Sequence, residues 1–238
     1  MTDLRYITFA LCVIVCTVFT PIFLVEQRRG FSRKSLLYKM ICATCYLAGG
    51  FIAMSSIEEP GAYTKLMLAG LCLSWAGDLL LHIDGRFKTP CIITGGLCFL
   101  SAHVAFICAY SAASGGAFLS PGGWVAVIGI VVIYTMFMLL GIKIPVSKLL
   151  VPMIVYGSVL SLMLVKAAFL SAELISDGTV AGGVLLVSGA LLFFLSDASI
   201  GVLMLSKKHK TNFPLKIFNI VTYFAGQLML ASTLFVIK

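Results

Sequence analysis

Four ionisable side chains lie inside long apolar stretches of the sequence: Asp78, His103, Lys166 and Asp197. An ionisable group at bilayer depth is costly, so each is a candidate for function. Two carboxyl groups that meet in a site of low dielectric constant do not both ionise readily, which leaves one as an acid and the other as a base. Such a pair suits reactions that pass through an oxocarbenium ion, as in glycoside cleavage. We therefore expect Asp78 and Asp197 to be catalytic.

The apolar composition of the chain places these residues inside a membrane. The 238 residues are 61% hydrophobic and 11% charged, with a mean hydropathy of +1.09, whereas a soluble domain carries about 25% charged residues. Apolar runs of about 20 residues recur along the chain, and each is long enough to cross a bilayer as a helix. Because a bilayer admits only helices or closed barrels, these unbroken runs predict an all-α polytopic membrane protein.

Turn and breaker residues divide the chain into eight predicted transmembrane helices, which form a single domain over residues 1–238 around an intramembrane pocket. The predicted spans are 6–25, 36–57, 63–83, 90–110, 122–141, 147–170, 180–205 and 214–237. All eight cysteines lie in apolar runs, including the C-x-x-C pair Cys42 and Cys45, and we expect them to pack between helices. The loops are too short for a globular site, so any chemistry must take place between the helices.

Basic residues follow every second span. Of the three other loops, two carry acidic residues, Glu58 with Glu59 and Glu173 with Asp177, and the third carries none. The positively charged residues in or beside the basic loops are Arg28, Arg29, Arg33, Lys34, Arg86, Lys88, Lys143, Lys148, Lys207, Lys208, Lys210 and Lys216. The positive-inside rule predicts that these loops are cytoplasmic and that both termini lie outside, in the plasma membrane if the source is bacterial. Since the net charge of +8 is spread over short loops and forms no patch, we expect no nucleic-acid partner.

Polar side chains from six predicted spans are expected at similar depths. With a rise of about 1.5 Å per residue, five of them fall in a layer roughly 8–14 Å from the cytoplasmic edge. They are Asp78, Tyr134, Tyr156, Asp197 and Tyr223. His103 lies deeper, near the midplane, with Gln227 at its level. Because buried tyrosine and glutamine also bond helices together, both packing and substrate binding remain open for them.

Other polar residues near these spans receive separate interpretations. Lys166 lies near the outer end of its span, where its stem can snorkel to the interface, and we interpret it as structural. Lys39, near the cytoplasmic start of the second span, either snorkels or holds an anionic headgroup. His82 and His209 border basic loops and are expected to be solvated. Ser74 and Ser196 complete the predicted substrate-binding residues.

The two aspartates occur in similar local sequences. Gly77-Asp78 resembles Ser196-Asp197, and the aspartates are 119 residues apart, half the length of the chain. A parallel duplication of four helices plus four helices would place them at equivalent depths, facing each other.

Short motifs in four spans resemble the YhhN family of multipass membrane proteins, which includes the lysoplasmalogenases. In chain order they are Gly77-Asp78-x-x-Leu81, Ala102-His103, Leu195-Ser196-Asp197, and Thr222-Tyr223 followed by Gln227. The resemblance covers nearly the whole chain and extends to eight spans. Phe224 and Gly226 stand where the family often has Tyr and Ala, which bears on substrate fit rather than on the acids.

The resemblance implies hydrolysis of the vinyl ether bond of lysoplasmalogens, giving a fatty aldehyde and glycerophosphocholine or glycerophosphoethanolamine. The aspartates of the family's Gly-Asp and Ser-Asp motifs fall on Asp78 and Asp197. An acid would protonate the alkene carbon, water would add to the oxocarbenium ion, and the hemiacetal would break down. The implied partners are the lysophospholipid and membrane lipids, with no metal or cofactor. The sequence does not assign the acid and base roles or an oligomeric state.

Two alternatives remain open at this point. A zinc-dependent intramembrane lipid hydrolase normally needs three protein ligands, but only His103 lies deep enough, with His82 as a marginal second. A proton-coupled transporter of lipids or small molecules would also use intramembrane aspartates, and a parallel repeat fits such a protein.

Overall fold

The computed structural model describes residues 2–55, 57–83, 90–115, 118–143, 150–206, 208–209 and 211–237. Within these ranges the protein is all-α. The helices are α1 (Thr2–Arg28), α2 (Arg33–Met54), α3 (Ala62–Ile83), α4 (Pro90–Ala113), α5 (Pro121–Met136), α6 (Leu150–Ser176), α7 (Val180–Leu205) and α8 (Phe213–Thr233), with a π-helical turn, Phe137–Gly141, directly after α5.

The predicted eight spans are confirmed, with shifts at their ends. All eight helices, with the π-helical turn continuing α5, are long and apolar enough to cross a membrane, so the protein is an integral multi-pass membrane protein. The first helix continues to Arg28 and the sixth to Ser176, whereas the second and eighth end at Met54 and Thr233. Five of the basic residues in the loops predicted to be cytoplasmic lie outside the described parts of the chain: Arg86, Lys88, Lys148, Lys207 and Lys210.

Local sequence explains where several helices begin. Ser32 caps α2 through a capping box with Ser35, and Ser120 caps α5 just before Pro121. Asn212 caps α8, where its side-chain oxygen accepts a hydrogen bond from the amide of Leu215. These side chains satisfy amide groups that have no partner within the first turn of a helix.

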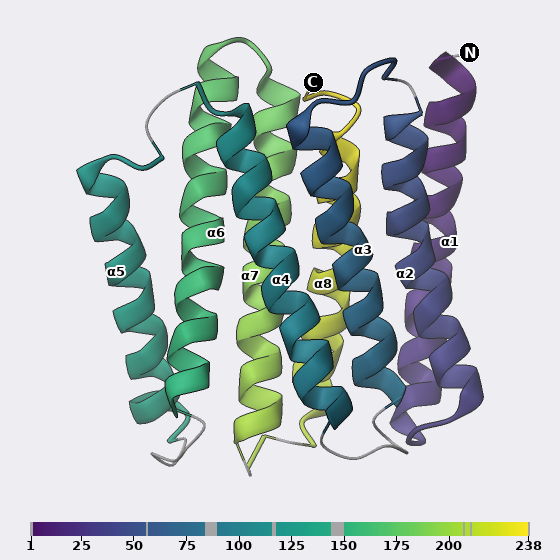
Figure 1. Ribbon diagram of the computed structural model, residues 1–238. Helices are drawn as coiled ribbons and strands as arrows, with labels where there is room; N and C mark the ends of the chain where they lie inside the picture. Colours follow the sequence, from purple (N-terminus) through teal and green to yellow (C-terminus); the bar gives the residue numbers. More distant parts are fainter. Residues whose placement is uncertain are drawn as a thin grey trace.

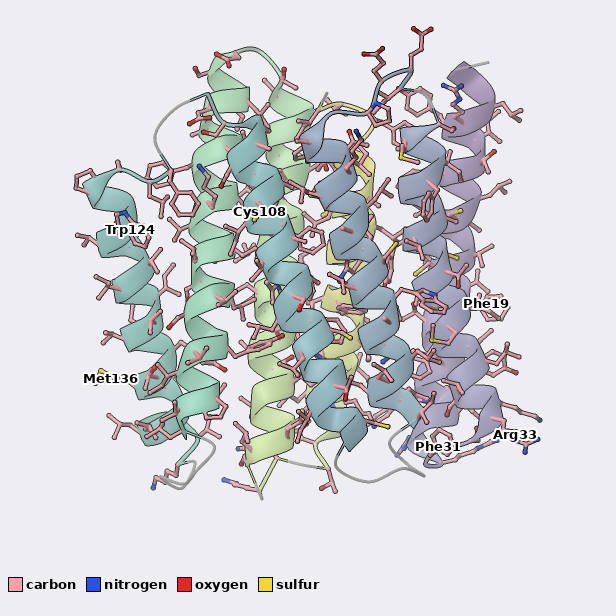
Figure 2. The ribbon with its side chains drawn as sticks, viewed as in Figure 1. Phe19, Phe31, Arg33, Cys108, Trp124 and Met136 are labelled. Atoms are coloured by element: carbon pink, nitrogen blue, oxygen red, sulfur yellow. The ribbon has the colours of Figure 1, made fainter. Side chains whose placement is uncertain are left out.

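The helices run alternately up and down, so that both termini lie at one face and the α1–α2 and α7–α8 turns at the other (Figure 1). The α1–α2 turn carries Arg29 and Arg33, whereas the α2–α3 connection at the face of the termini carries Glu58 and Glu59. Exposed side chains on α5 are apolar, among them Trp124 and Met136, which are 46% and 53% exposed (Figure 2). A surface of this kind suits contact with lipid.

Contacts between α3 and α4 recur between α7 and α8, which supports the duplication suggested by the sequence. A Cβ atom at Gly77 would lie 2.7 Å from the ring of Phe99, so glycine is required for this close approach. At the corresponding positions, 119 and 120 residues later, Asn219 donates hydrogen bonds to Ser196. Likewise the close approach of Gly70 to Phe106 is matched by that of Gly189 to Gly226. The two halves therefore place α3 and α7 in equivalent positions.

Candidate functional site

Asp78 on α3 is buried and every carboxylate oxygen has a partner. Oδ1 forms an ion pair with Lys39 of α2 at 2.9 Å. Oδ2 accepts a hydrogen bond of 2.6 Å from Tyr223 of α8 and one of 3.0 Å from Tyr46 of α2. The two phenol oxygens lie 3.2 Å from each other. We call these four residues the Asp78 network.

Asp197 on α7 is the centre of a second network. Its Oδ2 accepts a hydrogen bond from Tyr156 of α6 and lies 2.8 Å from Nε2 of His103 of α4. The same His103 nitrogen lies 3.2 Å from the Tyr156 hydroxyl, and the other ring nitrogen lies 3.2 Å from Sδ of Met163. No hydrogen bond reaches Oδ1 of Asp197 from the described residues. We call Asp197, His103 and Tyr156 the Asp197 network.

The directions of the helices bring the members of each network together. Side chains lean toward the start of their own helix. Both aspartates lie on helices that run away from the face of the termini, whereas their partners lie on α2, α4, α6 and α8, which run toward it (Figure 1). Because these helices are antiparallel, the aspartate side chains tilt toward one face of the bundle and the side chains of their donors tilt toward the other. The two sets of side chains can therefore meet.

The aspartates and one donor of each network correspond under the duplication, and each network takes a donor from the other half of the chain. Tyr46 and Tyr156 each lie on the helix before an aspartate, but they are 110 residues apart and do not occupy equivalent positions. Tyr223 of the second half bonds Asp78, whereas His103 of the first half bonds Asp197. His103 and Tyr223 are 120 residues apart, close to the spacing of the aspartates. The halves are thus joined at both acids.

Aromatic rings lie between the two networks. The ring of Phe193 lies 4.7 Å from that of His103 and 5.6 Å from that of Tyr223. Phe99 packs edge-on against both Phe193 and Tyr223. No hydrogen bond or ion pair joins Asp78 directly to Asp197 among the described residues. The rings of Phe99 and Phe193, which we call the aromatic wall, therefore connect His103 of one network with Tyr223 of the other.

Several other residues that the sequence suggested for the site make no hydrogen bond to either aspartate in the described parts of the chain. Tyr134 packs in a core cluster with Met138, with its ring against Gly157 and its hydroxyl near Gly201, one helical turn after Asp197, so it lies near Asp197 as expected. Ser196 accepts a hydrogen bond from the side chain of Asn219. Ser74 and Gln227 are fully buried, and their side-chain polar atoms have no protein partner in the described parts of the chain.

The expectation of a solvated His82 is wrong, and Lys166 is buried. Lys166, which we interpreted as structural, is 2% exposed, and its ammonium donates a 2.8 Å hydrogen bond to the carbonyl of Phe118. His82 is buried instead of solvated, because its ring packs between Phe23 and Phe31 and its Nε2 lies 2.9 Å from Oγ of Ser35. Lys39 is also withdrawn from water, in the ion pair with Asp78.

Sequence reasoning missed Tyr46 and Asn219. Tyr46 lies 13 residues after the start of α2 at Arg33, deeper in its helix than the layer in which we expected the aspartates, so depth alone did not select it. Its spacing of seven residues from Lys39, two helical turns, was a usable signal because it puts both side chains on one face.

A cavity of about 430 Å³ lies between α1 and α8, lined mainly by apolar side chains. One of them, Phe224, follows Tyr223 of the Asp78 network directly in the sequence of α8. Within the described ranges no group of three His, Cys, Asp or Glu side chains is placed to hold a metal ion.

Comparison with known families gives one match: the model of the YhhN family matches residues 34–234. That range contains every member of both networks. Neither the curated proteins nor the solved structures contain a match to this chain.

Proposed function

The chain belongs to the YhhN family, and we propose that it is a membrane-embedded lysoplasmalogenase, which hydrolyses the vinyl ether bond of a lysoplasmalogen. The observation that carries the proposal is the pair of buried carboxyl groups, each with its own set of donors, on either side of one aromatic wall. A scaffold protein has no need of two deep acids, whose burial is costly.

The two acids differ in charge environment, and we assign their roles on that basis. Asp78 has the ammonium of Lys39 at 2.9 Å and acts as a carboxylate. Asp197 has a phenol and an imidazole as partners, both at Oδ2, which leaves Oδ1 to carry a transferable proton. Asp197 is therefore the acid that protonates the alkene carbon, and Asp78 is the carboxylate that stabilises the oxocarbenium ion.

The aromatic wall between the acids also has a role in this proposal. The faces of aromatic rings attract cations, so Phe193 and Tyr223 favour the positive charge that develops on the ether carbon. Both acids can act on one bond only when the vinyl ether lies along Phe193, which requires this ring to turn aside as the substrate enters. The cavity between α1 and α8 would hold the hydrocarbon chain, because it is apolar and its lining includes Phe224, the residue after Tyr223.

The test is aldehyde release by detergent-purified protein, followed with a coupled dehydrogenase, from choline and ethanolamine lysoplasmalogens. The matched control substrate is the saturated 1-alkyl lysophospholipid, which lacks the alkene carbon that the acid protonates. We expect aldehyde from the vinyl ether lipids alone. Absence of aldehyde from both lysoplasmalogens would reject the proposed activity.

A proton-coupled transporter is the second candidate, and the duplication of the bundle favours it. Transporter sites often lie at the interface between two repeats, and here each aspartate is bonded by a donor from the other half. Proton-dependent uptake into vesicles would support transport, whereas aldehyde release in detergent, where no gradient exists, would support hydrolysis.

A further inference from the structure

Ser74 and Gln227 lie one helical turn from the two residues that join α3 to α8 at Asp78. Residues four apart share one face of a helix, so Ser74 faces the same side of α3 as Asp78, and Gln227 the same side of α8 as Tyr223. Two hydrogen bonds between these helices lie on either side of them, Tyr223 to Asp78 at 2.6 Å and Tyr63 with Thr233 at 2.7 Å. Ser74 and Gln227 therefore face the same space between α3 and α8.

The polar atoms of these two side chains are buried without partners. Ser74 and Gln227 are both 0% exposed, and the Ser74 hydroxyl and both Gln227 amide atoms lack any hydrogen bond to the described residues. Burying such groups unpaired is costly, and native proteins commonly satisfy them with an ordered water. A water can accept from the amide nitrogen and donate to the amide and hydroxyl oxygens, which gives it the usual two to four partners.

The other half of the chain has no such pair. By the spacing of the aspartates, the position equivalent to Ser74 is Phe193, and by the spacing of His103 and Tyr223, the position equivalent to Gln227 is Ile107. Phe193 is fully buried and Ile107 is 7% exposed, and both are apolar. The polar pair therefore distinguishes the Asp78 side from the Asp197 side of an otherwise duplicated arrangement.

We propose that Ser74 and Gln227 bind a water molecule beside Asp78, and that this is the water that adds to the oxocarbenium ion. The reactive role of this water rests on the proposed function, whereas the existence of the water site does not depend on activity. Ser74 and Gln227 are positioning residues, whereas Asp78 receives the proton.

The resulting step balances in atoms and charge. Asp197 has given its proton to the alkene carbon, and the water oxygen forms a bond to the cationic carbon while one of its protons passes to Asp78. The hemiacetal then breaks at the bond to the glycerol oxygen, which takes the proton from Asp78. The hemiacetal hydroxyl returns its proton to Asp197, so both acids regain their starting states and nothing is oxidised or reduced.

The first test needs no turnover. An experimental density map of the wild-type protein at about 2 Å resolution should show a water within about 2.7–3.2 Å of Ser74 Oγ and a Gln227 amide atom. The same map of Gln227→Leu should lack it. A direct hydrogen bond between Ser74 and Gln227 with no water between them would overturn the site, even if the wild-type protein hydrolyses its substrate.

The second test asks whether this water reacts. In Gln227→Leu and Ser74→Ala, kcat for aldehyde release should fall about 100-fold with little change in KM, as for other misplaced reactants. Because the cation would then revert, substrate recovered from D₂O should contain deuterium at the alkene carbon. Ser74→Ala removes a single atom and guards against misfolding of the larger change.

The matched control is Tyr110→Phe, which removes another fully buried hydroxyl that has no partner among the described residues. It should leave kcat unchanged. A raised KM with normal kcat in Gln227→Leu would mean that the pair binds a substrate hydroxyl instead, and would overturn the inference. If the wild-type protein releases no aldehyde, the proposed function and this reactive role both fail, while the density map still decides the water site.

Discussion

The hydroxyl of Tyr223 donates a 2.6 Å hydrogen bond to Oδ2 of Asp78 across 145 residues of sequence. This bond ties the last helix to the third, and Tyr46 adds a second donor at 3.0 Å to the same oxygen. In the other half His103 and Tyr156 converge in the same way on Asp197. Each aspartate therefore joins helices from both halves of the chain. Because each keeps a second donor, removal of one tyrosine hydroxyl should lower activity more than it lowers the stability of the fold.

Tyr223→Phe should lower the rate of aldehyde release by about 10- to 100-fold, because a hydrogen bond to a charged group contributes about 1.5–3 kcal/mol. Tyr46 keeps one donor on Asp78, so the variant should still fold. Initial rates with purified protein measure the effect. Equal rates for Tyr223→Phe and the control Tyr110→Phe would show that the bond to Asp78 has no role in turnover.

Lys39→Met should destabilise the protein by about 3–5 kcal/mol, because it leaves the carboxylate of Asp78 buried without its cation. The double variant Lys39→Met with Asp78→Asn should recover most of this loss, since no unpaired charge remains. Thermal unfolding in detergent measures both variants. If the double variant is as unstable as the sum of the single variants, the ion pair is not the source of the effect.

The orientation of the chain is open to a labelling experiment. The positive-inside rule predicts that Arg33, in the basic α1–α2 turn, is cytoplasmic and that Glu59 lies outside. In a background without exposed native cysteines, Glu59→Cys in intact cells should react with a membrane-impermeant maleimide, whereas Arg33→Cys should react only after lysis. The reverse pattern would invert the topology.

Chelation should leave aldehyde release unchanged, since the proposed mechanism uses carboxyl groups and no metal. The measurement compares activity before and after dialysis against a strong chelator, together with the zinc content of the purified protein. Stoichiometric zinc whose removal abolishes turnover, with loss of zinc in His103→Ala, would favour the alternative of a zinc-dependent hydrolase.

The span pattern could be predicted because hydropathy and loop charge are local properties of sequence. Depth along each span also selected Asp78, His103, Tyr156, Asp197 and Tyr223, all of which lie in one of the two networks. Depth gives no information on the direction in which a side chain points around its helix. For that reason it could not show that Tyr134, which lies near Asp197, packs its ring against Gly157 and makes no hydrogen bond to Asp197 among the described residues.

Partners were harder to predict than depths. The position of Lys39 near the start of its span predicts a lysine at the membrane interface. Only the packing of α2 against α3 shows that it forms an ion pair with Asp78. The separation of the acids by Phe193 depends on how α7 packs against α4 and α8, which a single sequence does not specify. The similarity of Gly77-Asp78 to Ser196-Asp197 covers only two residues, but it pointed to the duplication. Contacts at corresponding positions of α3–α4 and α7–α8 support that duplication.

The central claim is that both buried acids act on one vinyl ether bond. The most direct measurement compares initial rates of aldehyde release for wild type, Asp78→Asn and Asp197→Asn, each shown to be folded by gel filtration and thermal unfolding. The account predicts that either substitution abolishes detectable turnover, because neither the proton donor nor the stabilising carboxylate can be replaced by an amide. Normal turnover by either folded variant would contradict it.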